Sequence, residues 1–113
     1  MKKIFYTILV IGMMIVNISC ADEPEPEIRV LNSRLNKANV QFKTDAGNTV
    51  NINDVEPGQL TTYQDLDKGN LTVSAVIQDE PVKPVITFFA VKGIKYTIVI
   101  VGGQVASLRI DRE

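Results

Sequence analysis

The chain after residue 27 is built from short runs in which apolar and polar residues alternate. In Asn39–Lys43, Val40 and Phe42 alternate with polar neighbours, and Thr49–Asn53 repeats the pattern. A period of two places successive side chains on opposite faces of an extended strand and makes one face apolar. Turn-forming Gly, Pro, Asn and Asp residues separate the runs at intervals of roughly 8–12 residues, without helical periodicity. The pattern indicates an all-β domain.

About eight such runs are expected to form a single small antiparallel β-sandwich with a Greek-key path. The run Lys95–Val101 is the most β-prone and becomes apolar on both faces, which predicts a central strand. Gly102 and Gly103 follow it and are expected to close a tight hairpin. The expected strands are Ile28–Asn32, Asn39–Lys43, Thr49–Asn53, Leu60–Leu66, Leu71–Ile77, Val85–Val91, Lys95–Val101 and Gln104–Ile110.

Residues 1–19 have the layout of a secretory signal peptide. Lys2 and Lys3 precede an almost unbroken apolar run, Ile4–Ile18, which ends just before the small residue Ser19. A stable transmembrane helix needs about 20 apolar residues, and this run is shorter. A cleaved signal is therefore the expectation.

Cys20 follows the signal directly and is the only cysteine, so it cannot form an intramolecular disulfide. The segment from Ile18 through Ala21 resembles the lipobox of bacterial lipoproteins, although Asn17 stands where leucine is usual. The resemblance implies that Cys20 carries a diacylglycerol thioether and becomes the mature N-terminus. Two or more acyl chains hold a protein stably on a membrane. We therefore expect a lipoprotein anchored to the outer membrane of a bacterial cell envelope, facing either the periplasm or the cell surface.

Residues 20–27 comprise this cysteine and an acidic, proline-containing stretch. Its residues after Cys20 read Ala-Asp-Glu-Pro-Glu-Pro-Glu. Such a composition favours extended chain and cannot form a core. It predicts a tether that separates the membrane from a domain over residues 28–113. The stretch also resembles the surface-export signals of some bacterial lipoproteins, and a plain spacer is the alternative.

The composition argues against several classes of function. Histidine is absent, which removes the commonest general base and a common metal ligand. An acylated Cys20 would leave neither a thiolate nucleophile nor a zinc thiolate. The net charge is −1, without a dense basic patch, which disfavours nucleic acid as a partner. We therefore predict a protein that is not an enzyme and needs no metal or other cofactor.

The domain resembles a bacterial domain of unknown function, number 4397, found in exported proteins and lipoproteins. The resemblance rests on Ile28–Asn32 with Val40–Phe42, on Gly58 with Tyr63 and the segment from Leu66 to Val73, and on the segment from Lys92 to Gly102. It implies an immunoglobulin-like or transthyretin-like β-sandwich in the cell envelope. It supplies neither an activity nor site residues.

A few residues are candidates for particular roles. Asp65 and Asp67 precede a glycine, as in the start of a calcium loop, but position twelve of such a loop would be Val76, which excludes an EF-hand. Ordinary turn chemistry is therefore the expectation, and a loose calcium site built with Asp54 or Glu56 is the alternative. Tyr63 is expected to be a corner tyrosine, with a packed ring and a hydroxyl bonded to the backbone. Phe88 and Phe89 point to opposite faces of one strand, so one must be core. The other is expected in the core as well, or it would mark a partner surface if exposed.

The sequence predicts a binding or structural module that presents loops or an edge strand to a protein or glycan partner. The candidate loops are Ser33–Lys37, Glu56–Leu60 and Asp79–Lys83. One alternative is a carbohydrate-binding or adhesin-like accessory protein, which would use Tyr63, Tyr96, Phe88 or Phe89. Another alternative is an inhibitor of an envelope hydrolase.

Overall fold

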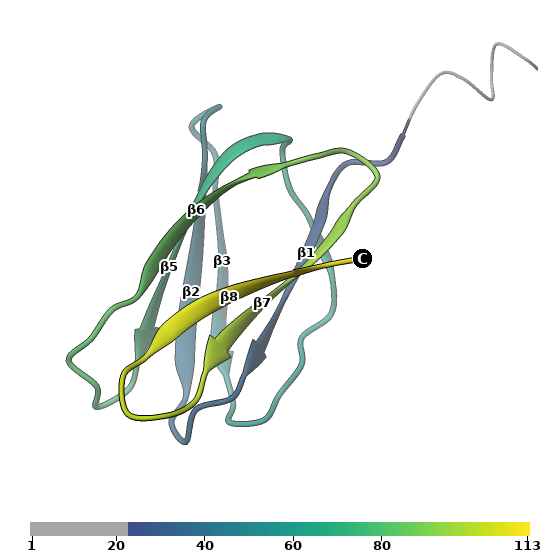
Figure 1. Ribbon diagram of the computed structural model, residues 1–113. Helices are drawn as coiled ribbons and strands as arrows, with labels where there is room; N and C mark the ends of the chain where they lie inside the picture. The colour runs from purple at the N-terminus through teal and green to yellow at the C-terminus, as the bar shows by residue number, and fades with distance from the viewer. Residues whose placement is uncertain (1–22) are drawn as a thin grey trace, which may run out of the picture.

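The alternating runs form eight strands in the computed structural model, which describes residues 23–113 (Figure 1). The described part of the chain is all-β, as predicted, and contains no helix. In chain order the strands are β1 Glu27–Asn32, β2 Ala38–Thr44, β3 Thr49–Val55, β4 Gln64–Asp65, β5 Gly69–Ile77, β6 Val85–Ala90, β7 Lys95–Val101 and β8 Ser107–Arg112.

The strands make two four-stranded sheets packed face to face. Sheet A has the order β4-β1-β7-β8, and sheet B has the order β3-β2-β5-β6. Strands β1 and β7 pair in parallel, whereas every other pair of named strands is antiparallel. The chain leaves sheet A after β1, returns briefly for β4, completes sheet B with β5 and β6, and then re-enters sheet A in the direction of β1. The predicted sandwich is confirmed, with one parallel pair at the centre of sheet A.

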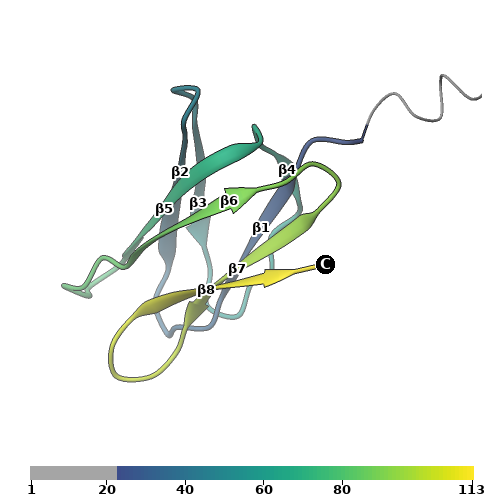
Figure 2. The same ribbon diagram turned by 45° about the horizontal axis from the view of Figure 1, so that its top comes forward.

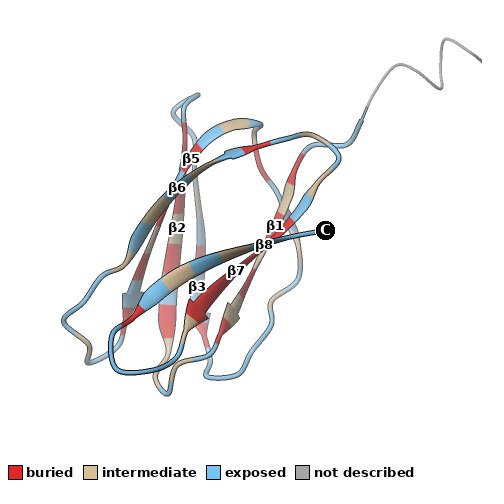
Figure 3. Ribbon diagram, in the orientation of Figure 1, coloured by how far each residue is buried: buried red, intermediate tan, exposed pale blue. Residues whose placement is uncertain are grey.

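The core lies between the sheets and is supplied mainly by the two central strands of each. Figure 3 shows buried residues along β1 and β7 of sheet A and along β2 of sheet B. Val40 and Phe42 face inward and are almost completely buried, as their alternation predicts. Strand β7 is central, as expected, and five of its seven residues are buried. The largest fully buried side chains include Tyr96, Phe42, Ile28, Leu71, Ile77, Ile98 and Ile100.

The expected strand Leu60–Leu66 is mostly irregular, and only Gln64 and Asp65 pair as a strand. The segment still follows the edge of β1, because Thr61 N–H donates to the Val30 carbonyl at 2.9 Å. The Val30 N–H in turn donates to the Thr61 hydroxyl, also at 2.9 Å, rather than to a main-chain carbonyl. A side-chain oxygen that takes the place of a backbone acceptor interrupts the ladder.

Gly102 and Gly103 do not form the expected two-residue hairpin. Residues 102–106 make a wider loop between β7 and β8. Gly103 has φ of 111°, in the region that favours glycine, and a Cβ on Gly102 would lie 2.8 Å from the Ser33 carbonyl oxygen. The carbonyls of Val101, at the end of β7, and of Gly103, in this loop, bind the side chain of Arg34, as described below.

The second half of the predicted tether packs against the sandwich. The Pro24 carbonyl accepts a hydrogen bond from Gly93 N–H at 2.8 Å, and the Pro26 carbonyl accepts one from Leu66 N–H at 2.9 Å. Glu25 pairs with Lys92 at 3.4 Å. Residues 24–26 therefore contact the sandwich directly. The signal peptide and Cys20 lie outside the described residues. Within residues 23–113, no helix is long and apolar enough to cross a membrane.

Candidate functional site

The three loops proposed from the sequence meet at one end of the sandwich. Strands β1, β3, β5 and β7 all run towards this end, so the segments that follow them gather there (Figures 1 and 2). The chain enters the sandwich at the opposite end, where Pro24 contacts Gly93. We call residues 33–37, 56–60, 78–84 and 102–106 the distal loops. The first three contain the candidate loops predicted from the sequence, and the fourth was not predicted as a binding loop.

Arg34 ties three of the distal loops together. Its Nε donates to Glu80 Oε2 at 2.8 Å, its Nη1 to the Val101 carbonyl at 2.8 Å and its Nη2 to the Gly103 carbonyl at 3.1 Å. The side chains of Arg34 and Glu80 are only 9% and 17% exposed. A planar guanidinium suits this arrangement, because its fixed donors reach several acceptors at once. Glu80 and the two carbonyls thus hold the loops in one arrangement.

Asn32 also connects separate segments by hydrogen bonds, and its side chain is completely buried. Its Nδ2 donates to the Asn36 carbonyl at 2.8 Å and to the Val55 carbonyl at 2.9 Å, and its Oδ1 accepts from Arg34 N–H at 2.9 Å. Asn32 belongs to β1 of sheet A and Val55 to β3 of sheet B, so these bonds join the sheets. A buried amide is tolerated because its polar atoms are satisfied.

The loops that Arg34 and Asn32 hold in place carry aliphatic side chains that are exposed to solvent. Leu35 is 91% exposed, Val105 is 67% exposed and Val82 is 41% exposed, and each belongs to a different distal loop. A shallow hollow of about 420 Å³ is lined by residues 33–36, Glu80, Gly102 and Gly103. Apolar side chains held out on restrained loops can bind a partner without a large ordering cost. Leu35, Val82 and Val105 thus form an exposed aliphatic surface at this end of the sandwich.

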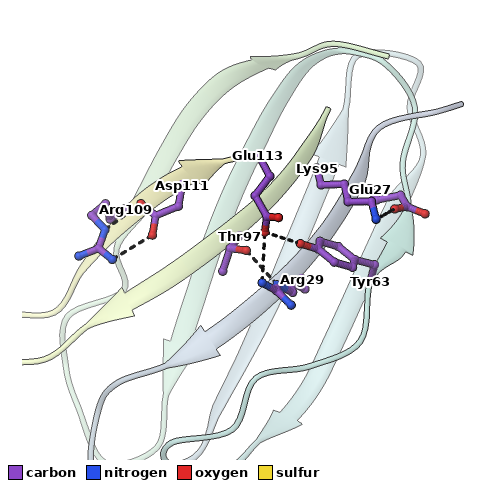
Figure 4. Close-up of polar contacts among 8 residues, drawn as sticks. All are labelled: Glu27, Arg29, Tyr63, Lys95, Thr97, Arg109, Asp111 and Glu113. Atoms are coloured by element: carbon purple, nitrogen blue, oxygen red, sulfur yellow. Dashed lines mark hydrogen bonds and ion pairs between the residues drawn. The ribbon is translucent and has the colours of Figure 1, made fainter. Parts of the chain in front are cut away.

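Tyr63 is not the corner tyrosine that its position suggested. It lies on the outer face of sheet A, where its hydroxyl donates to Glu113 Oε2 at 2.9 Å (Figure 4). The Arg29 guanidinium lies 4.5 Å from the centre of its ring, and the Lys95 ammonium lies 5.1 Å from it. Residues 60–63 follow the edge of β1 along an irregular path, and the side chain of Tyr63 lies over Arg29 on the outer face.

Tyr96 has the role expected of Tyr63. It is 1% exposed, and its hydroxyl accepts a hydrogen bond from the Val91 N–H, five residues upstream, at 2.9 Å. Its ring packs against Phe88 with 5.0 Å between centroids. The signal was present in the sequence, because Tyr96 stands near the start of the strongest strand, three residues after Gly93, as corner tyrosines stand near the start of a strand.

Phe88 and Phe89 divide between the two faces of β6. Phe88 packs on the core, as predicted, whereas Phe89 is 58% exposed on the outer face of sheet B. The expectation of a second core phenylalanine is therefore wrong. Strand β6 is an edge strand, and no described residue covers its outer face enough to bury this ring.

Asp67 stabilises the β2–β3 hairpin. Its Oδ2 accepts from Asn48 Nδ2 at 2.6 Å and from the Thr44 hydroxyl at 3.4 Å. Asp54 and Glu56, the other carboxylates considered for a calcium site, lie towards the opposite end of β3. Among residues 23–113, no three acidic, histidine or cysteine side chains are placed to hold a metal ion.

The charged groups of sheet A mainly bind one another. Arg29 donates to the Thr97 hydroxyl at 2.9 Å and to Glu113 at 3.3 Å (Figure 4). Arg109 makes two hydrogen bonds to Asp111, both of 3.0 Å. These bonds raise the pKa of Arg109 and lower the pKa of Asp111, because they favour the charged form of each group. Pairing of this kind gives a structural surface.

Neither a family model nor a curated protein matches this chain. The resemblance to domain 4397 stays a prediction, and the distal loops have to be interpreted from their own chemistry.

Proposed function

We propose that this protein is a lipid-anchored module of a bacterial cell envelope that binds another protein through its distal loops. The observation that supports this best is the position of these loops. They project from the end of the sandwich opposite Pro24, only four residues after the proposed lipid attachment at Cys20. Four residues span at most about 14 Å. Such a tether keeps one end of the domain near the lipid surface and directs the other away from it.

A protein partner fits the chemistry of the distal loops better than a glycan does. Their exposed apolar side chains are aliphatic, namely Leu35, Leu60, Val82 and Val105. The distal loops contain no aromatic residue that could stack on a sugar ring. The aromatics on which the glycan alternative depended are used elsewhere: Tyr96 and Phe88 pack on the core, and Tyr63 lies beneath Arg29. A binding role also agrees with the absence of histidine.

Site-specific photo-crosslinking in cells tests the role of the distal loops. A photoreactive amino acid at Leu35 should give a discrete protein adduct. The same group at Ala46, an exposed position in the β2–β3 turn at the opposite end, should not. A second distal position, Val105, should yield the same adduct as Leu35. An adduct of equal yield at Ala46, or none at either distal position, would contradict the proposal. An adduct with a cell-wall hydrolase would identify the partner class as that of an inhibitor.

The anchor is tested separately with Cys20→Ala. This variant should move from the membrane fraction to the soluble fraction, because the thioether cannot form without the thiol. Ser19→Gly, which keeps a small residue before the cysteine, serves as the control and should stay in the membrane fraction. Retention of Cys20→Ala on membranes would contradict lipid anchoring. Protease digestion of the wild-type domain on intact cells, compared with lysed cells, then decides between surface and periplasmic display.

A further inference from the structure

Strand β6 forms one edge of sheet B and carries an unusual sequence for an edge. Residues 85–91 read Val-Ile-Thr-Phe-Phe-Ala-Val, without a charge or a proline. Its only strand partner among the described residues is β5, so its other side is unpaired. An uncharged edge rich in β-branched and aromatic residues favours pairing with a further strand.

The register identifies the main-chain groups on the unpaired side. Ala75 N–H donates to the Pro84 carbonyl at 3.0 Å, and the same register places Val73 opposite Ile86. Hydrogen-bonded pairs alternate along an antiparallel ladder, so the even-numbered residues of β6 bond to β5. The N–H and C=O groups of the odd-numbered residues therefore point away from the sheet. These residues are Val85, Thr87 and Phe89.

The other edges of the sandwich are protected. Strand β8 carries Arg109, Asp111 and Arg112, and β4 has only two residues. The ladder between β2 and β3 has a register shift near Ala38, and Asp54 on β3 has φ of 58°. Charges, short strands and irregularities are the usual means by which proteins prevent edge pairing. Within residues 23–113, β6 is thus the one long edge strand without such protection.

We propose that β6 pairs antiparallel with β6 of a second copy of this chain, with Thr87 facing the partner's Thr87. Val85 then lies opposite the partner's Phe89, and Phe89 lies opposite the partner's Val85. Each of these pairs exchanges both main-chain hydrogen bonds, because all of the residues direct their free N–H and C=O groups to this side. The result is one continuous sheet that contains sheet B of both copies.

The side chains of β6 favour a second copy of this chain as the pairing partner. Val85 is 57% exposed and Phe89 is 58% exposed, and they stand at equal distances on either side of Thr87. The twofold register therefore joins each exposed apolar residue to its counterpart, and aromatic–aliphatic pairs stabilise neighbouring strands. Lys83 passes the partner's Val91 in this register, so like charges do not meet. This pairing depends on neither the distal loops nor Cys20, and it is independent of the proposed function.

Disulfide trapping in the full chain tests the pairing directly. In the proposed register the two Thr87 Cα atoms lie about 5.5 Å apart, within the range that a disulfide can bridge. Thr87→Cys should therefore give a covalent dimer under mild oxidation, above the level of the parent chain with Cys20 alone. Thr72→Cys is the matched control, because Thr72 is exposed on the same face beside Thr87. Its two copies would lie three strand spacings apart, about 14 Å, and should not crosslink.

The register is tested with Val85→Cys and Phe89→Cys. Either variant alone places its two cysteines about 14 Å apart along the strands and should give little dimer. A mixture of the two variants should crosslink efficiently, because Val85 faces the partner's Phe89. Adding Phe89→Lys to Thr87→Cys should lower the dimer yield about tenfold, since it removes both apolar pairs. Adding Asn53→Lys, which places the same charge on the far strand of sheet B, should leave the yield unchanged.

Three results would overturn the proposal. The first is a Thr87→Cys dimer no more abundant than that of the parent chain. The second is equal crosslinking by Thr72→Cys, which would indicate random collision. The third is a Thr87→Cys adduct with a different protein and no homodimer, which would show that β6 receives a strand from another partner.

Discussion

The two sheets pack against the same core, but their outer faces differ in chemistry. The outer face of sheet A is charged, and much of its charge is paired within the face. The outer face of sheet B carries hydroxyl, amide and apolar side chains, and Lys43 is its main charge. The charged residues on the outer face of sheet A are Glu27, Arg29, Lys95, Arg109, Asp111 and Glu113. The uncharged residues on the outer face of sheet B are Asn39, Gln41, Asn51, Asn53, Thr72, Ser74, Val76, Val85, Thr87 and Phe89.

Long charged side chains cover the strand beneath them. Thr97 and Val99 point outward from β7 but are only 8% and 4% exposed. The stems of arginine and lysine lie along apolar surface while their charged groups remain in water. Sheet B has shorter side chains on its outer face, so Val76 remains 48% exposed and Phe89 58% exposed.

The two outer faces differ in how many of their groups are already paired. An exposed ion pair contributes little to stability, but a network of such pairs covers a face and leaves few groups to bind anything else. In sheet A, Arg29, Tyr63 and Glu113 interact with one another. In sheet B, the edge strand β6 keeps both main-chain and side-chain groups unused. We therefore propose that a partner binds at β6 or at the distal loops.

The largest effect should come from breaking the connection between the sheets. Asn32→Ala removes the donor that joins β1 of sheet A to the Val55 carbonyl of β3, together with its bonds to the Asn36 carbonyl and the Arg34 N–H. We expect the free energy of unfolding to fall by about 3 kcal/mol. Urea denaturation measures it, with Asn53→Ala on the exposed face of sheet B as the control, within about 0.5 kcal/mol of wild type. A loss as small as that of the control would show that the sheets do not depend on this amide.

Two tyrosines on opposite faces of sheet A provide the next comparison. Tyr96→Phe keeps the ring packed on Phe88 but removes the oxygen that accepts the Val91 N–H. We expect a loss of about 1.5 kcal/mol in unfolding free energy. Tyr63→Phe removes only a hydroxyl bonded to an exposed carboxylate and should cost less than about 0.5 kcal/mol. Equal losses in thermal or urea denaturation would contradict the assignment of Tyr96 as the corner tyrosine.

The alternation of apolar and polar residues was sufficient to predict most strands and the face of each that points inward. The burial of Val40 and Phe42, for example, follows from the pattern within their own strand. The roles of Tyr63 and Tyr96 could not be assigned in the same way. Both follow turn residues, and what distinguishes them is the Thr61 hydroxyl, which interrupts the strand leading to Tyr63. A hydrogen bond between residues 31 positions apart has no signature in a local pattern.

Three of the distal loops were predicted from the sequence, but the side chains that connect them were not. Arg34 and Glu80 look like ordinary surface charges in the sequence, and they meet only because β1 and β5 end on the same side. Asn32 resembles a turn residue at the end of a strand. Its burial depends on Val55 of the other sheet, which no spacing rule relates to it.

The smallest effect concerns the charged face of sheet A. The hydrogen bonds from Arg109 favour the ionised carboxyl of Asp111 and lower its pKa below the ordinary value for aspartate. A lowered pKa in the folded state adds stability above the pKa of the unfolded chain, and this stability is lost as the pH falls through the folded value. Both side chains are exposed, so the change should be seen in the titration of Asp111 rather than in the melting temperature.

A carboxyl-detected NMR titration below pH 5 measures this pKa. Arg109→Gln should raise the pKa of Asp111 towards the ordinary value, because the variant loses the charge-assisted hydrogen bonds. Arg112→Gln removes a neighbouring charge, whose guanidinium lies 5.9 Å from the centre of the Tyr96 ring, and should change the pKa less. If both variants shift it equally, general attraction by the positive charges of β8 would be the cause. In that case the outer face of sheet A would be held by its overall charge and not by specific pairs.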